Sequence, residues 1–82
     1  MTVTVLLFAS IAEKAGLRRV ELDSRDGDTV RTVCDRLFTS YPDLRLFEPR
    51  LVYAVNEEYV RPDDPVPAGA TLALIPPVSG GC

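Results

Sequence analysis

Histidine is absent from this chain of 82 residues. Because histidine is the side chain that most often acts as a general acid or base near neutral pH, catalysis of that kind is not expected. The chain also lacks a glycine-rich loop of the type that cradles phosphates, so any ATP chemistry has to come from a partner. We therefore expect a protein that catalyses no reaction on its own.

Long apolar runs are also missing. The longest, from Val5 to Ala12, is interrupted by Ser10, whereas roughly 20 apolar residues are needed to cross a bilayer. No basic segment precedes this run, so it does not read as a signal peptide. The two cysteines are too few for a disulfide framework. These absences favour a cytoplasmic protein with no membrane partner.

Positive charge is scarce as well. Nine Lys and Arg residues stand against twelve Asp and Glu residues, which gives a formal net charge of −3. The basic residues are scattered along the chain, whereas nucleic-acid binding requires them in clusters. Nucleic acid is therefore not an expected partner. What the chain does have is 46% hydrophobic residues, enough to form the core of one small globular domain.

Five strands are predicted, and alternating polarity indicates the first, the second and the last of them. In the first of them, threonines alternate with Val3, Val5 and Leu7, which is a period of two with β-branched side chains. The predicted strands are Thr2–Phe8, Arg18–Asp23, Leu51–Val55, Tyr59–Arg61 and Thr71–Ile75. The first and last carry apolar residues on both faces, so both are expected in the centre of a sheet.

One long amphipathic helix is predicted after the second strand. Its apolar positions recur at i, i+3, i+4, i+7 and i+8 and are Val30, Val33, Cys34, Leu37 and Phe38. Asp28 or Thr29 is expected to cap its start, and Tyr41-Pro42 to end it. Cys34 lies on the apolar face, so we interpret it as an inert core residue. The aspartates around Gly27 fit a turn and helix cap better than a calcium loop, because the later bidentate glutamate is missing.

Shorter segments link these elements. A short helix is predicted over Ala9–Ala15, where Gly16 is a suitable C-terminal cap. Asn56-Glu57-Glu58 should form a turn and Pro62–Gly69 a loop. Residues 43–50 are expected to be irregular. Three of their apolar side chains should fold over the core: Leu44, Leu46 and Phe47.

Together the elements predict an α+β fold, with a mixed sheet of about five strands and one main helix packed on one face. Residues 1–77 would form this domain, and residues 78–82 a C-terminal tail with nothing to pack against. Pro76-Pro77 stops further strand pairing between the two, because proline lacks the N–H that pairing needs.

This order of elements is the β-grasp arrangement of ubiquitin, and the chain resembles the MoaD/ThiS-type ubiquitin-like sulfur carriers. Three motifs carry the resemblance: Val5-Leu6-Leu7-Phe8-Ala9, Ala54-Val55-Asn56 and Ile75-Pro76-Pro77-Val78-Ser79-Gly80-Gly81. A terminal Gly-Gly alone is a weak signal, but Pro-Pro-Val-Ser-Gly-Gly after a β-grasp pattern is a strong one. The similarity is greatest to the small subunits of molybdopterin synthase.

The resemblance implies a function in sulfur transfer. In that family an ATP-dependent activating enzyme adenylates the carboxylate of the last glycine, here Gly81 next to Gly80, and sulfur from a donor protein replaces AMP to leave a thiocarboxylate. In the molybdopterin branch the tail enters a larger catalytic subunit and gives its sulfur to the pterin precursor. The residues before the glycines would share that interface: Pro76, Pro77, Val78 and Ser79. The chain itself would bind no cofactor, since ATP is used by the activating enzyme.

Cys82 departs from the family pattern, which ends at the second glycine. As encoded, the carbonyl group of Gly81 is part of an amide, and an amide cannot be adenylated as a carboxylate can. We therefore predict that a peptidase removes Cys82. The alternative is that Cys82 is retained and carries sulfur as a persulfide on its thiol.

Strand alternation also predicts an apolar patch on the sheet face that the helix leaves open. Its members are Leu6, Phe8, Ala73 and Ile75, and Tyr59 on a neighbouring turn would extend it. An apolar patch facing water usually marks an interface. In the family that the chain resembles, the positions of Phe8, Tyr59 and Ile75 contact the larger subunit. The alternative is a patch covered by the 62–69 loop.

Other functions stay open at this point. The chain could carry sulfur for cysteine, thiamine or a secondary metabolite, although thiamine carriers tend to be shorter and to lack the Pro-Pro pair. It could instead be a protein modifier joined to lysines through Gly81, or a binding module whose C-terminal tail has no function.

Overall fold

Residues 1–76 are described by a computed structural model, in which they form five strands, two α-helices and one 3₁₀ helix. In chain order these are β1 (Thr2–Leu7), α1 (Ala9–Ala15), β2 (Arg19–Asp23), α2 (Val30–Ser40), η1 (Pro42–Arg50), β3 (Val52–Val55), β4 (Glu58–Val60) and β5 (Thr71–Ile75). The predicted strands and α-helices are all present, and strand ends differ by one residue at most. Within residues 1–76, no helix reaches the length and hydrophobicity that a membrane span requires.

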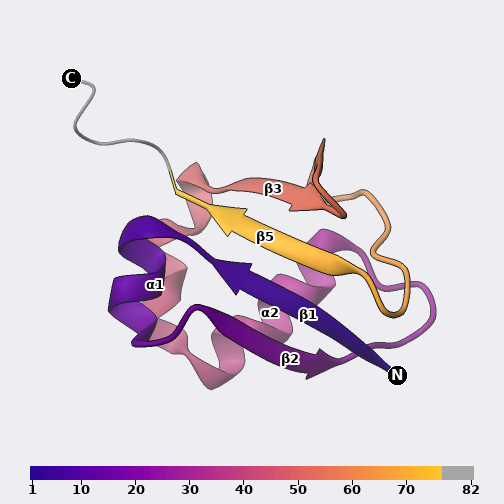
Figure 1. Cartoon of the computed structure of the whole chain (residues 1–82), viewed down its shortest axis with the longest axis horizontal. Coiled ribbons are helices and arrows are strands. Elements are labelled where there is room, and N and C mark those ends of the chain that lie inside the picture. Colours follow the sequence, from indigo (N-terminus) through magenta and orange to yellow (C-terminus); the bar gives the residue numbers. More distant parts are fainter. Residues whose placement is uncertain (77–82) are drawn as a thin grey trace.

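The five strands form one mixed sheet in the order β2-β1-β5-β3-β4. β1 and β5 pair in parallel, and the other neighbouring strands pair antiparallel. The two strands with apolar residues on both faces, β1 and β5, are therefore central, as their sequences predict. Figure 1 shows α2 behind the sheet and α1 beside the end at which β1 finishes, so α2 covers one face and the other face is open.

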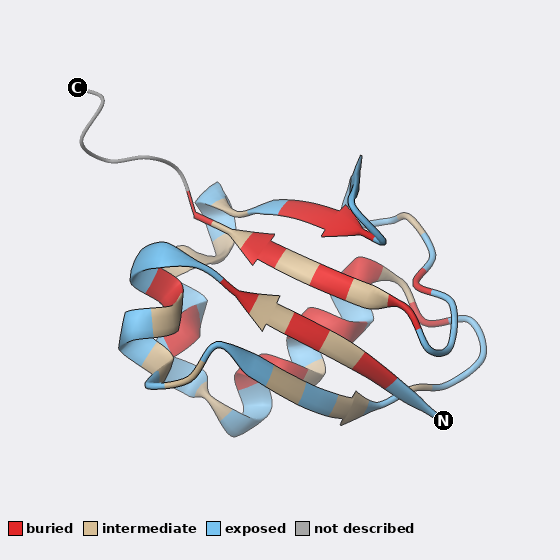
Figure 2. Cartoon of the chain, viewed as in Figure 1, coloured by how far each residue is buried: buried red, intermediate tan, exposed pale blue. Residues whose placement is uncertain are grey.

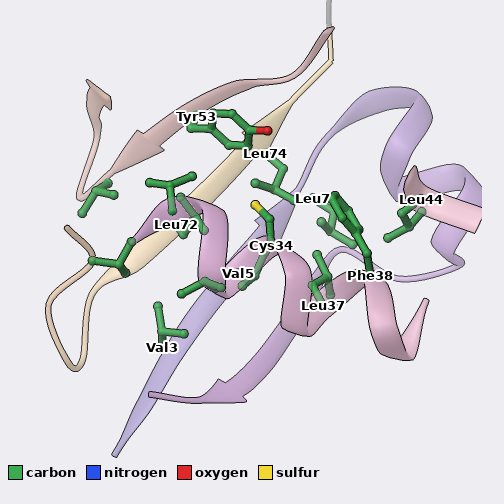
Figure 3. Packing of buried hydrophobic residues seen from close by; sticks show 14 of the residues in the cluster. Val3, Val5, Leu7, Cys34, Leu37, Phe38, Leu44, Tyr53, Leu72 and Leu74 are labelled. Atoms are coloured by element: carbon green, nitrogen blue, oxygen red, sulfur yellow. The ribbon is translucent and has the colours of Figure 1, made fainter. Parts of the chain in front are cut away.

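The covered face carries the hydrophobic core. β1 and β5 contribute alternate residues, and α2 contributes the five positions expected from its helical period (Figure 3). The largest fully buried side chains include Phe38, Leu37 and Leu72. Burying a side chain of this size stabilises the fold by about 1.5–3 kcal/mol relative to leaving it in water. The burial of these side chains between α2 and the sheet is therefore a large favourable contribution to stability.

Thr29 caps the start of α2. Its hydroxyl oxygen accepts a hydrogen bond from the Thr32 amide (3.3 Å), and the Thr32 hydroxyl oxygen accepts one from the Thr29 amide (2.8 Å). These reciprocal bonds make a capping box and satisfy two donors that a helix start leaves free. Of the two candidates from the sequence, the cap is therefore Thr29 and not Asp28.

Asp28 instead holds a buried ion pair. Its two carboxylate oxygens each accept a hydrogen bond of 3.0 Å from Arg36, and one also accepts a bond of 2.9 Å from the Arg25 amide. The Asp28 side chain is only 6% exposed. The hydrogen bonds from Arg36 outweigh the effect of burial and lower the pKa of Asp28 from 3.8 to about 2. The pair joins the turn before α2 to the middle of that helix.

Residues 42–50 form the 3₁₀ helix η1, so the expectation of an irregular segment is wrong. A 3₁₀ helix has three residues per turn, and side chains three positions apart share a face. Leu44 and Phe47 accordingly both pack on the core, whereas Leu46 is 79% exposed. The prediction that Leu46 folds over the core is wrong for this reason.

β3 and β4 form a hairpin with a two-residue turn. Asn56 and Glu57 have positive φ angles of 49° and 72°, as in the turns that best match the twist of two strands. Glu58 therefore belongs to β4 and pairs with Val55. The predicted three-residue turn is too long by one residue, and the predicted strand Tyr59–Arg61 is shifted by one.

The segment that links β4 to β5 lies over the start of α2. The carbonyl oxygens of Pro62 and Asp64 accept hydrogen bonds from the amides of Arg31 (2.9 Å) and Val30 (3.0 Å), two donors in the first turn of the helix. Val66 of the same segment is part of the hydrophobic core. Because this loop is bound on the helix side of the sheet, the structure argues against an apolar patch that the loop covers.

Candidate functional site

The open face of the sheet carries a row of residues that crosses four strands. Leu6 pairs with Ala73, Ala73 with Ala54, and Ala54 with Tyr59. The residues on either side of Leu6 point into the core, so Leu6 and its partners share the opposite face. Figure 2 views the sheet from this side, and buried residues, which point into the core, alternate along β1 and β5 with half-buried residues. Strand pairing thus brings together Leu6, Ala73 and Tyr59. Tyr59 lies in β4 and not on a turn, and it is 78% exposed.

A second row lies at the end of the sheet where β1 and β5 finish. Ile75 pairs with Val52 on one side. On the other side, Phe8 directly follows Leu7, which is the partner of Leu74 in β5. Phe8 and Val52 are both 44% exposed. Ile75 is therefore flanked by two strands that each present an exposed apolar side chain near this end of the sheet.

The sequence did not identify Val52 and Ala54 as members of this surface. The signal was present, because Tyr53 and Val55 of the same strand face the core and leave Val52 and Ala54 on the opposite side. The missing information was that β3 lies beside β5, which a local pattern does not encode. We refer to seven residues together as the open-face patch: Leu6, Phe8, Val52, Ala54, Tyr59, Ala73 and Ile75.

The open face of the sheet is apolar only toward the end at which β5 finishes, where the open-face patch lies. In the opposite direction, the next row on the same face contains Thr4 and Thr71, which pair with each other. On the outer strand β2, Arg19 and Glu21 form an exposed ion pair of 3.3 Å. A partner that covers this face would meet an apolar area bordered by polar groups on two sides, and an apolar area with a polar border is common in protein interfaces.

Pro76 is the last residue that the structure describes, and it is buried directly after β5. The predicted site residues beyond it lie outside the described residues: Pro77, Val78, Ser79, Gly80, Gly81 and Cys82. The segment that carries the two glycines is therefore attached at the apolar end of the open-face patch (Figure 1). A partner that binds the patch also meets the start of this segment.

Cys34 is not part of this surface. Its side chain lies in the core, 2% exposed, and burial raises the pKa of its thiol to about 12. A thiol that is enclosed and neutral is a poor nucleophile, so the prediction of an inert core residue is confirmed. Among residues 1–76, no three His, Cys, Asp or Glu side chains gather into a group that could hold a metal ion.

Comparison with known proteins identifies the family. A model of the ThiS family matches residues 5–81. The chain belongs to the ThiS family. The molybdopterin synthase sulfur carrier subunit of Chlamydomonas reinhardtii is 35% identical to this ThiS-family chain, over 99% of the chain and 100% of its own length. The small archaeal modifier protein 1 of Haloferax volcanii is 40% identical, over 92% of the chain and 95% of its own length.

A solved structure gives the same relationship for the fold. The crystal structure of SAMP1 from Haloferax volcanii matches this ThiS-family chain with a TM-score of 0.88 and 35% identity, and the match covers 99% of the chain and 100% of that protein. The mixed five-stranded sheet with helices on one face is therefore the ubiquitin-like β-grasp fold that the sequence predicts. Proteins named as sulfur carrier subunits and as modifiers both occur among the relatives of this ThiS-family chain.

Proposed function

We propose that this chain is a cytoplasmic sulfur carrier of molybdenum cofactor biosynthesis and the small subunit of a molybdopterin synthase. In this proposal an ATP-dependent partner enzyme adenylates the carboxylate of Gly81, and sulfur from a donor protein replaces AMP to form a thiocarboxylate. The tail then delivers this sulfur inside a larger catalytic subunit. The chain donates sulfur and catalyses no step itself.

The observation that carries the proposal is the attachment of the tail at the apolar end of the open-face patch. A larger subunit that binds the patch would hold Pro76 at the edge of the contact. Five extended residues, from Pro77 to Gly81, reach roughly 17 Å, enough to bring the last carbonyl carbon into a partner while the domain stays outside. Gly80 and Gly81 have no Cβ, so they can pass through a channel too narrow for larger residues.

The chemistry requires a free carboxylate on Gly81. A carboxylate is a weak electrophile, because its charge and its resonance oppose attack by a nucleophile. Transfer of AMP from ATP to the carboxylate releases pyrophosphate and gives a mixed anhydride. Sulfur at the oxidation level of sulfide then attacks the carbonyl carbon of this anhydride, and AMP leaves. Because Cys82 blocks the carboxylate as an amide, the proposal includes removal of Cys82 by a peptidase before activation.

The intact mass of the chain recovered from its native cells tests this proposal. We expect a species that has lost one cysteine residue, and a second species in which sulfur replaces one oxygen of the shortened chain. The first species would show that Cys82 has been removed, and the second would show that Gly81 has become a thiocarboxylate. A chain that keeps Cys82 throughout and never gains sulfur on Gly81 would contradict the proposal, and sulfur gained by the full-length chain would support a persulfide on Cys82 instead.

A second candidate function is protein modification through Gly81. The observation that favours it is the similarity to the small archaeal modifier protein 1 along nearly the whole chain. Both functions use an activated Gly81, but a modifier passes its carbonyl carbon to an amine of another protein. Denaturing gels of the same cell extract separate the two functions, because conjugates of high mass are expected only for a modifier.

Replacing Phe8 by alanine should weaken binding of the molybdopterin synthase large subunit. Phe8 is exposed, lies outside the core and adjoins the end of β5, so we expect it to be an anchor of the contact. Truncating an aromatic anchor of this kind typically costs about 2 kcal/mol or more, which corresponds to roughly thirtyfold weaker binding. Calorimetric titration of the large subunit with wild-type and Phe8→Ala chains measures the loss.

Leu46→Ala is the matched control for this experiment. Leu46 is also a large exposed apolar residue, but it lies on η1 and outside the open-face patch, so its removal should leave the affinity unchanged. Both variants should keep the wild-type melting temperature within a few degrees. Equal losses of affinity in the two variants would argue that the open-face patch is not the binding surface, and unfolding of Phe8→Ala would mean that Phe8 belongs to the core.

A further inference from the structure

Ala9, the first residue of α1, has a left-handed backbone with φ of +51°. This region is unfavourable for a residue with a Cβ. Among residues 1–76, the other non-glycine residues with positive φ are Asn56 and Glu57, and both lie in the two-residue hairpin turn that requires it. That explanation does not apply to Ala9. Strain of this kind tends to occur at functional sites, and here it occurs next to Phe8, a residue of the candidate site.

Ala9 forms the corner between the open face and the core. Phe8 before it has an extended backbone (φ −123°, ψ 153°) and is 44% exposed, whereas Ile11 after it is fully buried. The chain thus passes from strand to helix, and from exposed to buried positions, within four residues. Phe8 makes no side-chain cap bond, and the amide of Ala12 donates to its carbonyl oxygen over a long distance of 3.4 Å. The backbone angle of Ala9 therefore helps to set the direction of Phe8 relative to α1.

The other end of α1 offers a comparison. Gly16 also has a positive φ, +76°, and a Cβ added there would meet no atom within 4 Å. Glycine reaches the left-handed region without strain, but it also reaches many other conformations and so fixes its neighbours less firmly. Beside the exposed aromatic residue the chain has alanine, which allows fewer conformations at the cost of some strain.

We infer that the left-handed backbone of Ala9 holds Phe8 in its binding position, which makes Ala9 a positioning residue for the partner interface. The inference rests on the proposed function for the identity of the partner, the large subunit of a molybdopterin synthase. Phe8 and Leu6 line one surface depression together with Ala12 and Leu17. A side chain already held in place loses less conformational entropy when the partner binds, and affinity rises accordingly.

Ala9→Gly tests the inference, because it removes the restriction while the left-handed conformation stays available. We expect an unchanged or higher melting temperature, since strain is relieved. Binding of the large subunit should nevertheless weaken by about three- to tenfold. In the free protein, NMR order parameters of the Phe8 and Ala9 amides should fall from about 0.85 toward about 0.6.

Two variants serve as controls. Ala9→Asn keeps a Cβ and tolerates the left-handed backbone, so it should retain wild-type order and affinity. Ala68→Gly makes the same chemical change in the exposed loop before β5, at the end of this strand that is opposite to Ile75. It should lower the melting temperature slightly without changing the affinity.

Wild-type order parameters at Phe8 in the Ala9→Gly chain would overturn the inference, and so would reduced order with unchanged affinity. If the wild-type chain itself does not bind the large subunit, the proposed function fails. The order parameters then still decide whether Ala9 holds Phe8 in place, because they are measured without a partner.

Discussion

Deleting Gly80 and Gly81 from a chain that lacks Cys82 is expected to abolish sulfur acceptance and leave the domain folded. The shortened chain still ends in a carboxylate, now on Ser79, but the reach of the tail beyond Pro76 falls from roughly 17 Å to roughly 10 Å. The last carbonyl carbon would then stop several ångströms short of the activating site. Because a displacement of about 1 Å can already reduce a rate by about a hundredfold, we expect charging to fall to background.

The measurement uses the activating enzyme, ATP and a source of sulfide, and it follows the mass of the carrier over time. Gly81→Ala is the informative control, since it keeps the length of the tail and adds one methyl group. It should be charged more slowly than the wild-type tail but faster than the deletion variant. The melting temperatures of all three chains should agree, because the hydrophobic core lies within residues 1–76. Normal charging of the deletion variant would show that the glycines are not the reactive end.

Much of this fold could be predicted because its layers are simple. One main helix packs on one face of one sheet, so a period of 3.6 in α2 and a period of two in β1 and β5 point directly to most of the buried residues. The prediction that β1 and β5 are central follows from the same pattern, since only central strands need apolar residues on both faces. The two candidate glycines near the end of the chain could also be identified from the sequence, because the chemistry proposed for them depends on residue type and not on packing.

The remaining features depend on contacts between distant residues. η1 was not predicted because its three-residue period becomes visible only once Leu44 and Phe47 pack on the core. Val52 joins the open-face patch only because β3 pairs with β5. The strained angle of Ala9 arises at a corner between a strand and a helix that no local propensity specifies. A local pattern specifies none of these features. Val52 belongs to the open-face patch, and Ala9 directly follows Phe8 of that patch.

Asp28→Asn should destabilise the fold by about 2 kcal/mol at neutral pH. The substitution keeps the shape of the side chain but replaces the charged carboxylate, whose two oxygens accept hydrogen bonds from Arg36, by a neutral amide. The pKa of Asp28 is lowered from 3.8 to about 2, and a shift of this size corresponds to roughly 2 kcal/mol of stabilisation of the ionised form. The loss is larger than that of most single surface substitutions, because the Asp28 carboxylate is almost fully buried.

The pH dependence gives this prediction its sharpest test. Since the pKa of Asp28 is lower in the folded state than in the unfolded state, its contribution is fully present above about pH 4 and is lost as the pH falls toward about 2. Urea unfolding of the wild type and of Asp28→Asn should therefore differ by about 2 kcal/mol at pH 7 and converge near pH 2. Asp63→Asn is the matched control, because Asp63 pairs with Arg31 at 2.8 Å but is 86% exposed, and such pairs contribute about 0–1 kcal/mol. A difference between wild type and Asp28→Asn that stays constant from pH 7 to pH 2 would mean that the buried charge is not what stabilises the start of α2.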